Sequence, residues 1–213
     1  MRKIILLVVC LAGAALNIGL NRLCMLANIP LYLDTVFTIA VTLMGGLFFG
    51  SLCGALTNLI HHSVWFWGWE GYLFTLCNIA TACITWLFVR IFPRELRLFA
   101  ETDKTAPPVQ SLNKGMDRMI VLILLSFALC IAMSVLGGFL TALILSLSPA
   151  HAGERGLSVL LSTTLFNSNL PLVLVEILSR IPINIIDRLI SAFGGYAIAL
   201  ACTPLFKERS GKT

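Results

Sequence analysis

Long apolar runs, separated by short polar or proline-containing breaks, make up most of the chain. The longest starts at Leu31 and reads LYLDTVFTIAVTLMGGLFFGSLCGALTNLI, ending at Ile60. A transmembrane helix needs about 20 apolar residues, so this run is too long for one crossing and too short for two ordinary ones. Gly45 and Gly46 stand in its middle, where glycine lets a chain turn. The pattern predicts a tight helical hairpin with Asp34 at its mouth.

The other runs predict four further helices around this hairpin. The first ends before Pro30, since proline and the residue preceding it disfavour helix. The six expected helices cover residues 4–26, 34–44, 47–64, 71–91, 118–147 and 183–205. The expected fold is an all-α, polytopic membrane protein, a six-helix transmembrane bundle with a short second helix and a Gly-rich turn into the third.

Two polar segments separate the later helices. Residues 93–117 contain Pro107-Pro108 and many charges but no apolar periodicity, which predicts a loop. Residues 148–182 hold two apolar pieces, 157–166 and 170–181, whose lengths of about 10–12 residues suit re-entrant or interfacial segments. Whether these pieces are re-entrant, interfacial or spanning stays open. We expect residues 1–213 to form a single integral membrane domain.

Composition and charge agree with a membrane location. The chain is 58% hydrophobic and 12% charged, against about 25% charged residues in soluble domains. The net charge of +5 favours cytoplasmic loops over nucleic-acid binding, because Lys and Arg gather on the inner side of membrane proteins. With both termini cytoplasmic, the Lys and Arg residues on the outer side are Arg22, Arg155, Arg180 and Arg188.

The N-terminus adds one alternative to this layout. Arg2 and Lys3 precede an apolar stretch that resembles a secretory signal peptide. The apolar run continues to Leu26, which favours a retained first helix over a cleaved leader.

Polar residues inside the predicted helices are the candidates for function, because ionisable groups are costly in lipid. Asn17 and Asn21 share one face of the first helix, as do Glu176 and Arg180 further along the chain. Pairs such as Arg22–Asp34 and Asp187–Arg188 have an alternative interpretation as charge neutralisation near the interface. The candidate substrate-binding residues are Asn17, Asn21, Asp34, Asn58, His61, Glu176 and Arg180.

Neither a metal site nor an enzyme is expected. His61 and His62 are adjacent on a helix and point in different directions, with no Cys or carboxylate at ligand spacing. The seven cysteines lie in apolar runs and form no CxxC pair. Nucleotide-binding loops and zinc-protease motifs are absent from the sequence, so we expect no catalytic residues and no cofactor.

Small residues mark faces where helices can approach closely. Gly46, Gly50 and Gly54 repeat at a spacing of four, and Ala15 and Gly19 form a similar pair. These five residues are candidates for docking, either within the chain or against a partner.

The run IPLYLDTVFTIAVTLMGGLFFGSLCGALTNLI and the later segment RIPINIIDRLIS, from Arg180 to Ser191, resemble the S components of energy-coupling factor (ECF) vitamin transporters. The resemblance implies a subunit in the plasma membrane of a bacterium that captures a small vitamin-like nutrient. It also implies docking on a transmembrane coupling protein with two ATPase subunits. A face of small residues on the first helix meets that protein in the family, and Ala15–Gly19 is the nearest match. A membrane sensor module and a stand-alone carrier are the alternatives, and the substrate and oligomeric state stay open.

Overall fold

The computed structural model describes residues 2–65, 69–96, 98, 108–147 and 170–207, and these residues form helices joined by short connections, with no strand among them. Five of the helices are long and apolar enough to cross a membrane, so the chain is a multi-pass membrane protein, as predicted. The helices are α1 (Arg2–Leu26), α2 (Val36–Trp65), α3 (Glu70–Leu73), α4 (Thr75–Ile91), α5 (Pro93–Leu96), α6 (Pro108–Leu147) and α8 (Leu172–Lys207).

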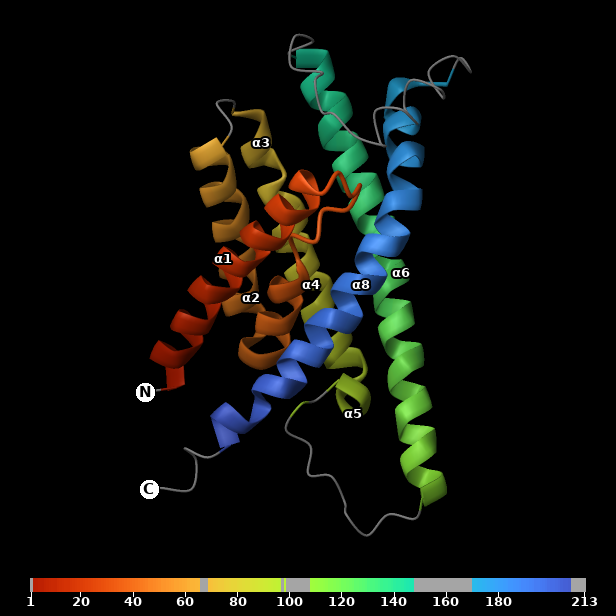
Figure 1. Cartoon of the computed structure of the whole chain (residues 1–213). Helices are drawn as coiled ribbons and strands as arrows, with labels where there is room; N and C mark the ends of the chain where they lie inside the picture. The colour runs from red at the N-terminus through yellow and green to blue at the C-terminus, as the bar shows by residue number, and fades with distance from the viewer. Residues whose placement is uncertain (1, 66–68, 97, 99–107, 148–169, 208–213) are drawn as a thin grey trace.

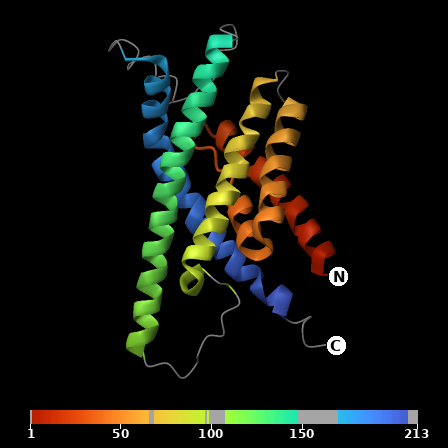
Figure 2. The ribbon, with the colours of Figure 1, turned by 180° about the vertical axis from the view of Figure 1, so that it is seen from behind.

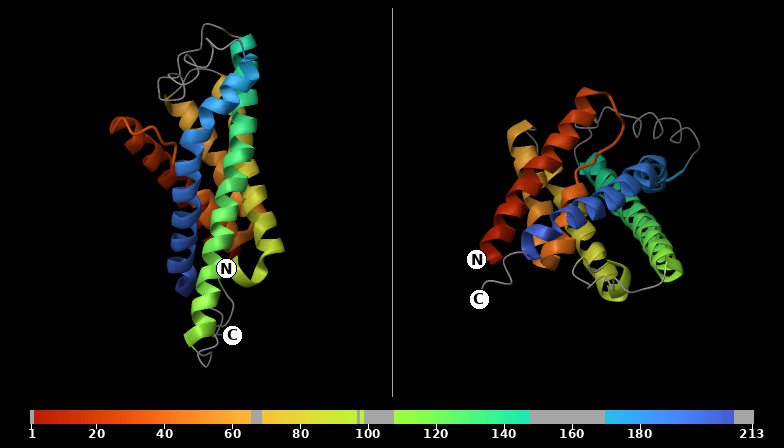
Figure 3. Two further views of the ribbon diagram at one scale, coloured as in Figure 1. Left: turned by 90° about the vertical axis from the view of Figure 1, so that its right-hand side faces the viewer. Right: turned by 60° about the horizontal axis from the view of Figure 1, so that its bottom comes forward.

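The helices run up and down between two ends of one bundle. The start of α1, the short α5, the start of α6 and the end of α8 lie at the lower end in Figure 1. The upper end holds α3, the end of α6 and the start of α8. Seen from the side, α1 leans away from the vertical α6 (Figure 3).

The long α2 is a hairpin of two unequal arms. Its backbone leaves the helical region at Gly46, where φ is 81° and ψ is −172°. The side-chain amide of Asn17 donates to both Thr38 and Thr57 of α2, at 3.0 and 3.2 Å. In a straight helix these threonines would stand about 28 Å apart, so the chain must fold back between them. We call residues 36–45 the short arm and residues 47–65 the long arm (Figure 2).

Close glycine contacts hold the two arms together and against α4. A Cβ atom at Gly50 would overlap the side chain of Thr42 on the short arm. A Cβ at Gly54 would come within 2.9 Å of the carbonyl oxygen of Asn78 on α4. The predicted hairpin is therefore confirmed, and Gly50 and Gly54 are buried by the chain's own helices. Gly46 is half-buried at the turn, whereas Ala15 and Gly19 are exposed on α1.

The short arm lies in the centre of the bundle. Its Ile39 is fully buried in a cluster with Leu125 and Leu129 of α6 and Ala192 of α8. A Cβ at Gly195 of α8 would stand 2.7 Å from a backbone oxygen of the short arm, which shows how closely the two backbones approach. An arm of ten residues is about 15 Å long, roughly half the thickness of the hydrocarbon core. The segment that precedes it is thus carried into the interior of the protein.

The last helix begins earlier than the sequence pattern predicts. Residues 172–181, expected to form a re-entrant or interfacial piece, are the first part of α8, which continues through Pro182. A proline inside a helix removes one backbone hydrogen bond. This part of the helix packs closely on α6, because a Cβ at Gly138 would lie 2.7 Å from the backbone nitrogen of Ile177. The piece at 157–166 falls outside the described residues.

The expected loop at 93–117 is also partly helical. Residues 93–96 form α5, and α6 begins at Pro108, nine residues before the predicted end of the loop. Proline is well suited to the first position of a helix, where its missing N–H is not needed.

We predict that Gly54→Ala destabilises the protein. The added methyl group meets backbone atoms of Asn78, which cannot move aside as a flexible side chain would. Overpacking of this kind costs about 1–3 kcal/mol, more than the gain of about 1 kcal/mol that alanine brings to a helix. The check is the thermal unfolding of the two purified proteins in detergent.

Gly19→Ala is the matched control, because no described atom beyond its chain neighbours and its own helix backbone lies within 4 Å of a Cβ at that position. This variant should unfold at or above the temperature of the unaltered chain. A Gly54→Ala protein as stable as the Gly19→Ala protein would contradict the close approach of α2 to α4.

Candidate functional site

The connection between α1 and α2, residues 27–35, is the one non-helical segment described inside the bundle. Asn28 and Leu33 have φ angles of 54° and 45°, values that residues other than glycine rarely adopt. Hydrogen bonds from two sides hold this segment. Asn21 of α1 donates to the carbonyl oxygen of Tyr32 at 2.8 Å, while Asp187 of α8 accepts the backbone N–H groups of Tyr32 and Leu33 at 2.9 and 2.8 Å.

Next to this segment lies a charge cluster made of Asp34, Asp187 and Arg188. An Nη atom of Arg188 stands 3.0 Å from Asp187 and 3.9 Å from Asp34. The other Nη atom donates to the hydroxyl of Thr35. Arg188 is thus the cation for two carboxylates. When Asp34 and Asp187 are both ionised, the cluster carries a net charge of about −1.

Asp34 is the member of the cluster with access to the outside. Its side chain is 20% exposed, against 6% for Arg188 and none for Asp187. Asn78 of α4 donates to its Oδ2 atom at 3.4 Å, while its Oδ1 atom, which is buried and faces Arg188, accepts no hydrogen bond from the described residues. Burial, together with the nearby charge of Asp187, raises the pKa of Asp34 above its ordinary value although Arg188 opposes the shift.

Asn17 joins α1 to both arms of the hairpin. It is fully buried, and besides its bonds to the two threonines it accepts the backbone N–H of Phe37 at 2.9 Å. That N–H belongs to the first turn of α2, where backbone donors have no partner in their own helix. Asn17 therefore organises the hairpin, and Asn21 organises the connection beside it.

Arg180 reaches the same region from one end of α8. It is buried and donates to Thr141 of α6 at 2.6 Å and to the hydroxyl of Tyr32 at 3.5 Å. Its guanidinium also lies 5.7 Å from the centre of the Phe74 ring. Glu176 is buried one turn earlier on α8.

The other two predicted residues lie on the long arm. Asn58 and His61 are both buried there. The His61 ring is 5.6 Å from that of Trp65, which the guanidinium of Arg22 covers at 5.0 Å. The suggested pairing of Arg22 with Asp34 is thus wrong, because Arg188 occupies that place and Arg22 lies against a tryptophan.

Several residues of this site are not among the predicted substrate-binding residues. The sequence predicts a neutralising pair for Asp187 and Arg188, and it predicts no binding role for Tyr32, Thr35 or Asn78. A signal existed for Asn78, since an amide in the apolar helix α4 is as unusual as those in α1. Tyr32 and Thr35 accept hydrogen bonds from Arg180 and Arg188 through their hydroxyl groups, and these partners lie about 150 residues away in the sequence.

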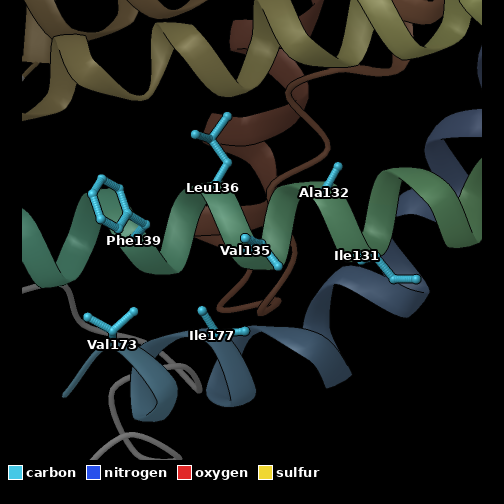
Figure 4. Close-up of a pocket in the computed structure, with 7 residues that line it drawn as sticks. All are labelled: Ile131, Ala132, Val135, Leu136, Phe139, Val173 and Ile177. Carbon is cyan, nitrogen blue, oxygen red and sulfur yellow. The ribbon is translucent and has the colours of Figure 1, made fainter. Parts of the chain in front are cut away.

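A groove between α6 and α8 lies apart from the charge cluster. Its volume is about 520 Å³, and every residue that lines it is apolar: Ile131, Ala132, Val135, Leu136, Phe139, Val173 and Ile177 (Figure 4). The α6 residues that meet the polar side of α8, Ser134 and Thr141, lie on a different face of the helix. Among the described residues, no group of three or more His, Cys, Asp or Glu side chains could hold a metal ion.

Comparison with known proteins finds one matching family model. Residues 5–152 match the family model for the N-terminal domain of the protein O-mannosyl-transferase TMEM260, more than half of the 213 residues. The chain belongs to this family. The matched part includes Asn17, Asp34 and Asn78, while Asp187 and Arg188 follow it. No curated protein and no solved structure matches the chain.

This membership overturns the resemblance to ECF S components. The expected capture of a vitamin-like nutrient is therefore wrong. The expected partnership with a coupling protein and two ATPase subunits is wrong for the same reason. The sensor and carrier alternatives gain no support from the family either. The resemblance misled because a glycine turn between two apolar helices is a packing arrangement that unrelated membrane proteins can share. Association with membrane lipid is all that remains of the expected partners.

The expectation that the chain is not an enzyme is wrong as well, since the family is that of a transferase. Motifs such as nucleotide loops belong to other kinds of enzyme.

We predict that Arg188→Met strongly destabilises the protein. The substitution leaves Asp34 and Asp187 close together without a cation, and breaking a buried ion pair in this way costs about 3–5 kcal/mol. The folded variant must then hold a proton that the unfolded chain releases at lower pH. Its stability should therefore fall further as the pH rises from about 5 to 8. Thermal unfolding in detergent at both pH values measures the effect.

Arg90→Met is the control, because Arg90 is exposed at the end of α4 and contacts only the Trp86 ring among the described partners. Its unfolding temperature should stay near that of the unaltered chain at both pH values. If Arg188→Met unfolded at the same temperatures as Arg90→Met at both pH values, the charge cluster would not stabilise the fold.

Proposed function

We propose that the chain is part of a membrane-embedded O-mannosyltransferase, which moves a mannosyl group from an activated donor to a hydroxyl group of a protein. Family membership over residues 5–152 supports the reaction class. The observation that carries the proposal is Asp34, a partly exposed carboxylate within the matched residues. Its Oδ1 atom is buried 3.9 Å from Arg188 and accepts no hydrogen bond from the described part of the chain.

In this reaction Asp34 is the general base. The bond between C1 of mannose and the leaving group breaks, and the leaving group keeps the electron pair. A new bond forms between C1 and the oxygen of the acceptor hydroxyl, whose proton passes to the carboxylate of Asp34. A carboxylate with a raised pKa is better suited to this step, since its proton affinity lies closer to the operating pH.

Positive charge near the loop suits an anionic leaving group. Arg180 donates to the hydroxyl of Tyr32 in this loop at 3.5 Å, whereas Arg188 is already paired with the two carboxylates of the charge cluster. Cations placed where negative charge develops stabilise a transition state. We assign Arg180 to substrate binding on this ground and give Asn17 and Asn21 a supporting role. Asn58, His61 and Glu176 stay predictions.

We also propose that the lower end of the bundle in Figure 1 faces the cytoplasm. That end carries Lys3 at the start of α1, Arg90 at the end of α4 and Arg94 on α5. This distribution is the one that the positive-inside rule favours. Residues 27–35 then open toward the opposite side of the membrane. Location in a bacterial plasma membrane stays a prediction.

An assay of the full chain in detergent or nanodiscs tests the reaction. The acceptor is a peptide containing serine and threonine, and mannose is supplied either on a nucleotide or on a lipid phosphate. The unaltered chain should add one hexose, detected by mass. Asp34→Asn should lower the rate at least about 100-fold, because the amide cannot accept the proton.

Asp117→Asn is the control, since Asp117 is an exposed carboxylate near the start of α6. It should transfer mannose at the unaltered rate. Full activity of Asp34→Asn would remove Asp34 from the reaction. No transfer by the unaltered chain from either donor would refute the proposed function.

Thiol labelling tests the orientation. Arg94→Cys on α5 and Tyr72→Cys on α3 place new thiols at opposite ends of the bundle. In intact cells, a membrane-impermeant maleimide should label Tyr72→Cys and leave Arg94→Cys unlabelled until the cells are opened. The signal of the unaltered chain measures the background from native cysteines. The reverse pattern would invert the proposed topology.

A further inference from the structure

Asp187 links the connection between α1 and α2 to the charge cluster. One of its oxygens, Oδ1, accepts the N–H groups of Tyr32 and Leu33, and the other, Oδ2, pairs with Arg188 at 3.0 Å. The side chain has no exposed surface. It therefore cannot reach a substrate itself, and whatever it contributes passes through the groups that it holds.

The groups that it holds determine where Asp34 points. Leu33 has a φ of 45°, a conformation that needs support from its surroundings in a residue with a branched side chain. Two N–H groups donated to one carboxylate oxygen provide that support. Asp34 follows Leu33 directly, so the backbone conformation fixed by Asp187 sets the direction of the Asp34 side chain.

We propose that Asp187 is a positioning residue that holds residues 32–34 so that the carboxylate of Asp34 faces the reacting hydroxyl. This inference rests on the proposed role of Asp34 in mannosyl transfer. Asp187 also holds Arg188 at 3.0 Å, which leaves the guanidinium 3.9 Å from Asp34. The same residue thus limits how strongly Arg188 neutralises Asp34.

The groups that face Asp34 define its response to pH. From α8 these are Asp187 and Arg188, and from α4 they are Asn78 and the thiol of Cys77. On α1, Cys24 lies near Asp187. Asp187→Asn removes a negative charge from beside Asp34 and frees Arg188 to approach it. Both changes lower the pKa of Asp34.

Two variants test the inference in the full chain with the mannosyl-transfer assay. Asp187→Ala removes both oxygens and should lower kcat about 10–100-fold through misplacement of Asp34. Asp187→Asn keeps an oxygen for the two N–H groups. It should remain folded, lose part of the rate, and move the rise of activity with pH toward lower pH. A merely structural role would reduce the amount of active protein without moving the pH profile.

Hydrogen exchange gives a readout that does not depend on activity. The amides of Tyr32 and Leu33, followed by mass spectrometry, should exchange faster in Asp187→Ala than in the unaltered chain. Asn184→Ala is the control, because Asn184 is buried about one turn away on α8 and bonds to Ser134 at 2.9 Å. It should leave exchange at Tyr32 and Leu33, and the pH profile, unchanged.

The outcomes separate the two proposals. Unchanged exchange in Asp187→Ala, or faster exchange with an unaltered rate and pH profile, would overturn the positioning role. No transfer by the unaltered chain would overturn the proposed function, and with it the part of the inference that concerns the reaction. Hydrogen exchange would then still decide whether Asp187 holds the loop.

Discussion

A segment without helical hydrogen bonds in the interior of a membrane protein must find partners for its backbone within the protein. Residues 27–35 meet this requirement through side chains from two distant helices. Asn21 takes up the carbonyl of Tyr32, and Asp187 takes up two N–H groups. The position of the short arm, the burial of Arg188 and the setting of Asp34 all depend on these bonds. An apolar residue at 187 would leave two backbone donors without their acceptor and would remove the nearer of the two carboxylates that pair with Arg188.

The overall architecture could be predicted because its causes lie close together in the sequence. Gly45 and Gly46 interrupt an apolar run, and the structure turns at Gly46. The boundary at Pro182 could not be predicted in this way. Whether a proline ends a helix or is absorbed by it depends on packing, and here the partner surface is Gly138 of α6, more than forty residues away.

Only part of the candidate site could be predicted from the sequence. Asp34 stood out as a carboxylate in an apolar run, and Asn17 and Asn21 as amides on one helical face. The partners of the connection could not be predicted, because the hydrogen bonds from residues 32 and 33 to Asp187 join residues about 155 positions apart in the sequence. A single sequence gives no means of choosing between Arg22 and Arg188 as the neighbour of Asp34. The reaction class came from the family, since one carboxylate fits many kinds of chemistry.

The charge cluster is divided between the connection that follows α1 and the last helix, and this has a consequence for how the protein is made. A ribosome delivers α1 and the hairpin to the membrane long before α8 exists. During that interval the short arm is about half a membrane long, and Asp34 lacks its cation. Because α8 supplies Asp187 and Arg188, the site can be complete only after this last helix has entered the bundle.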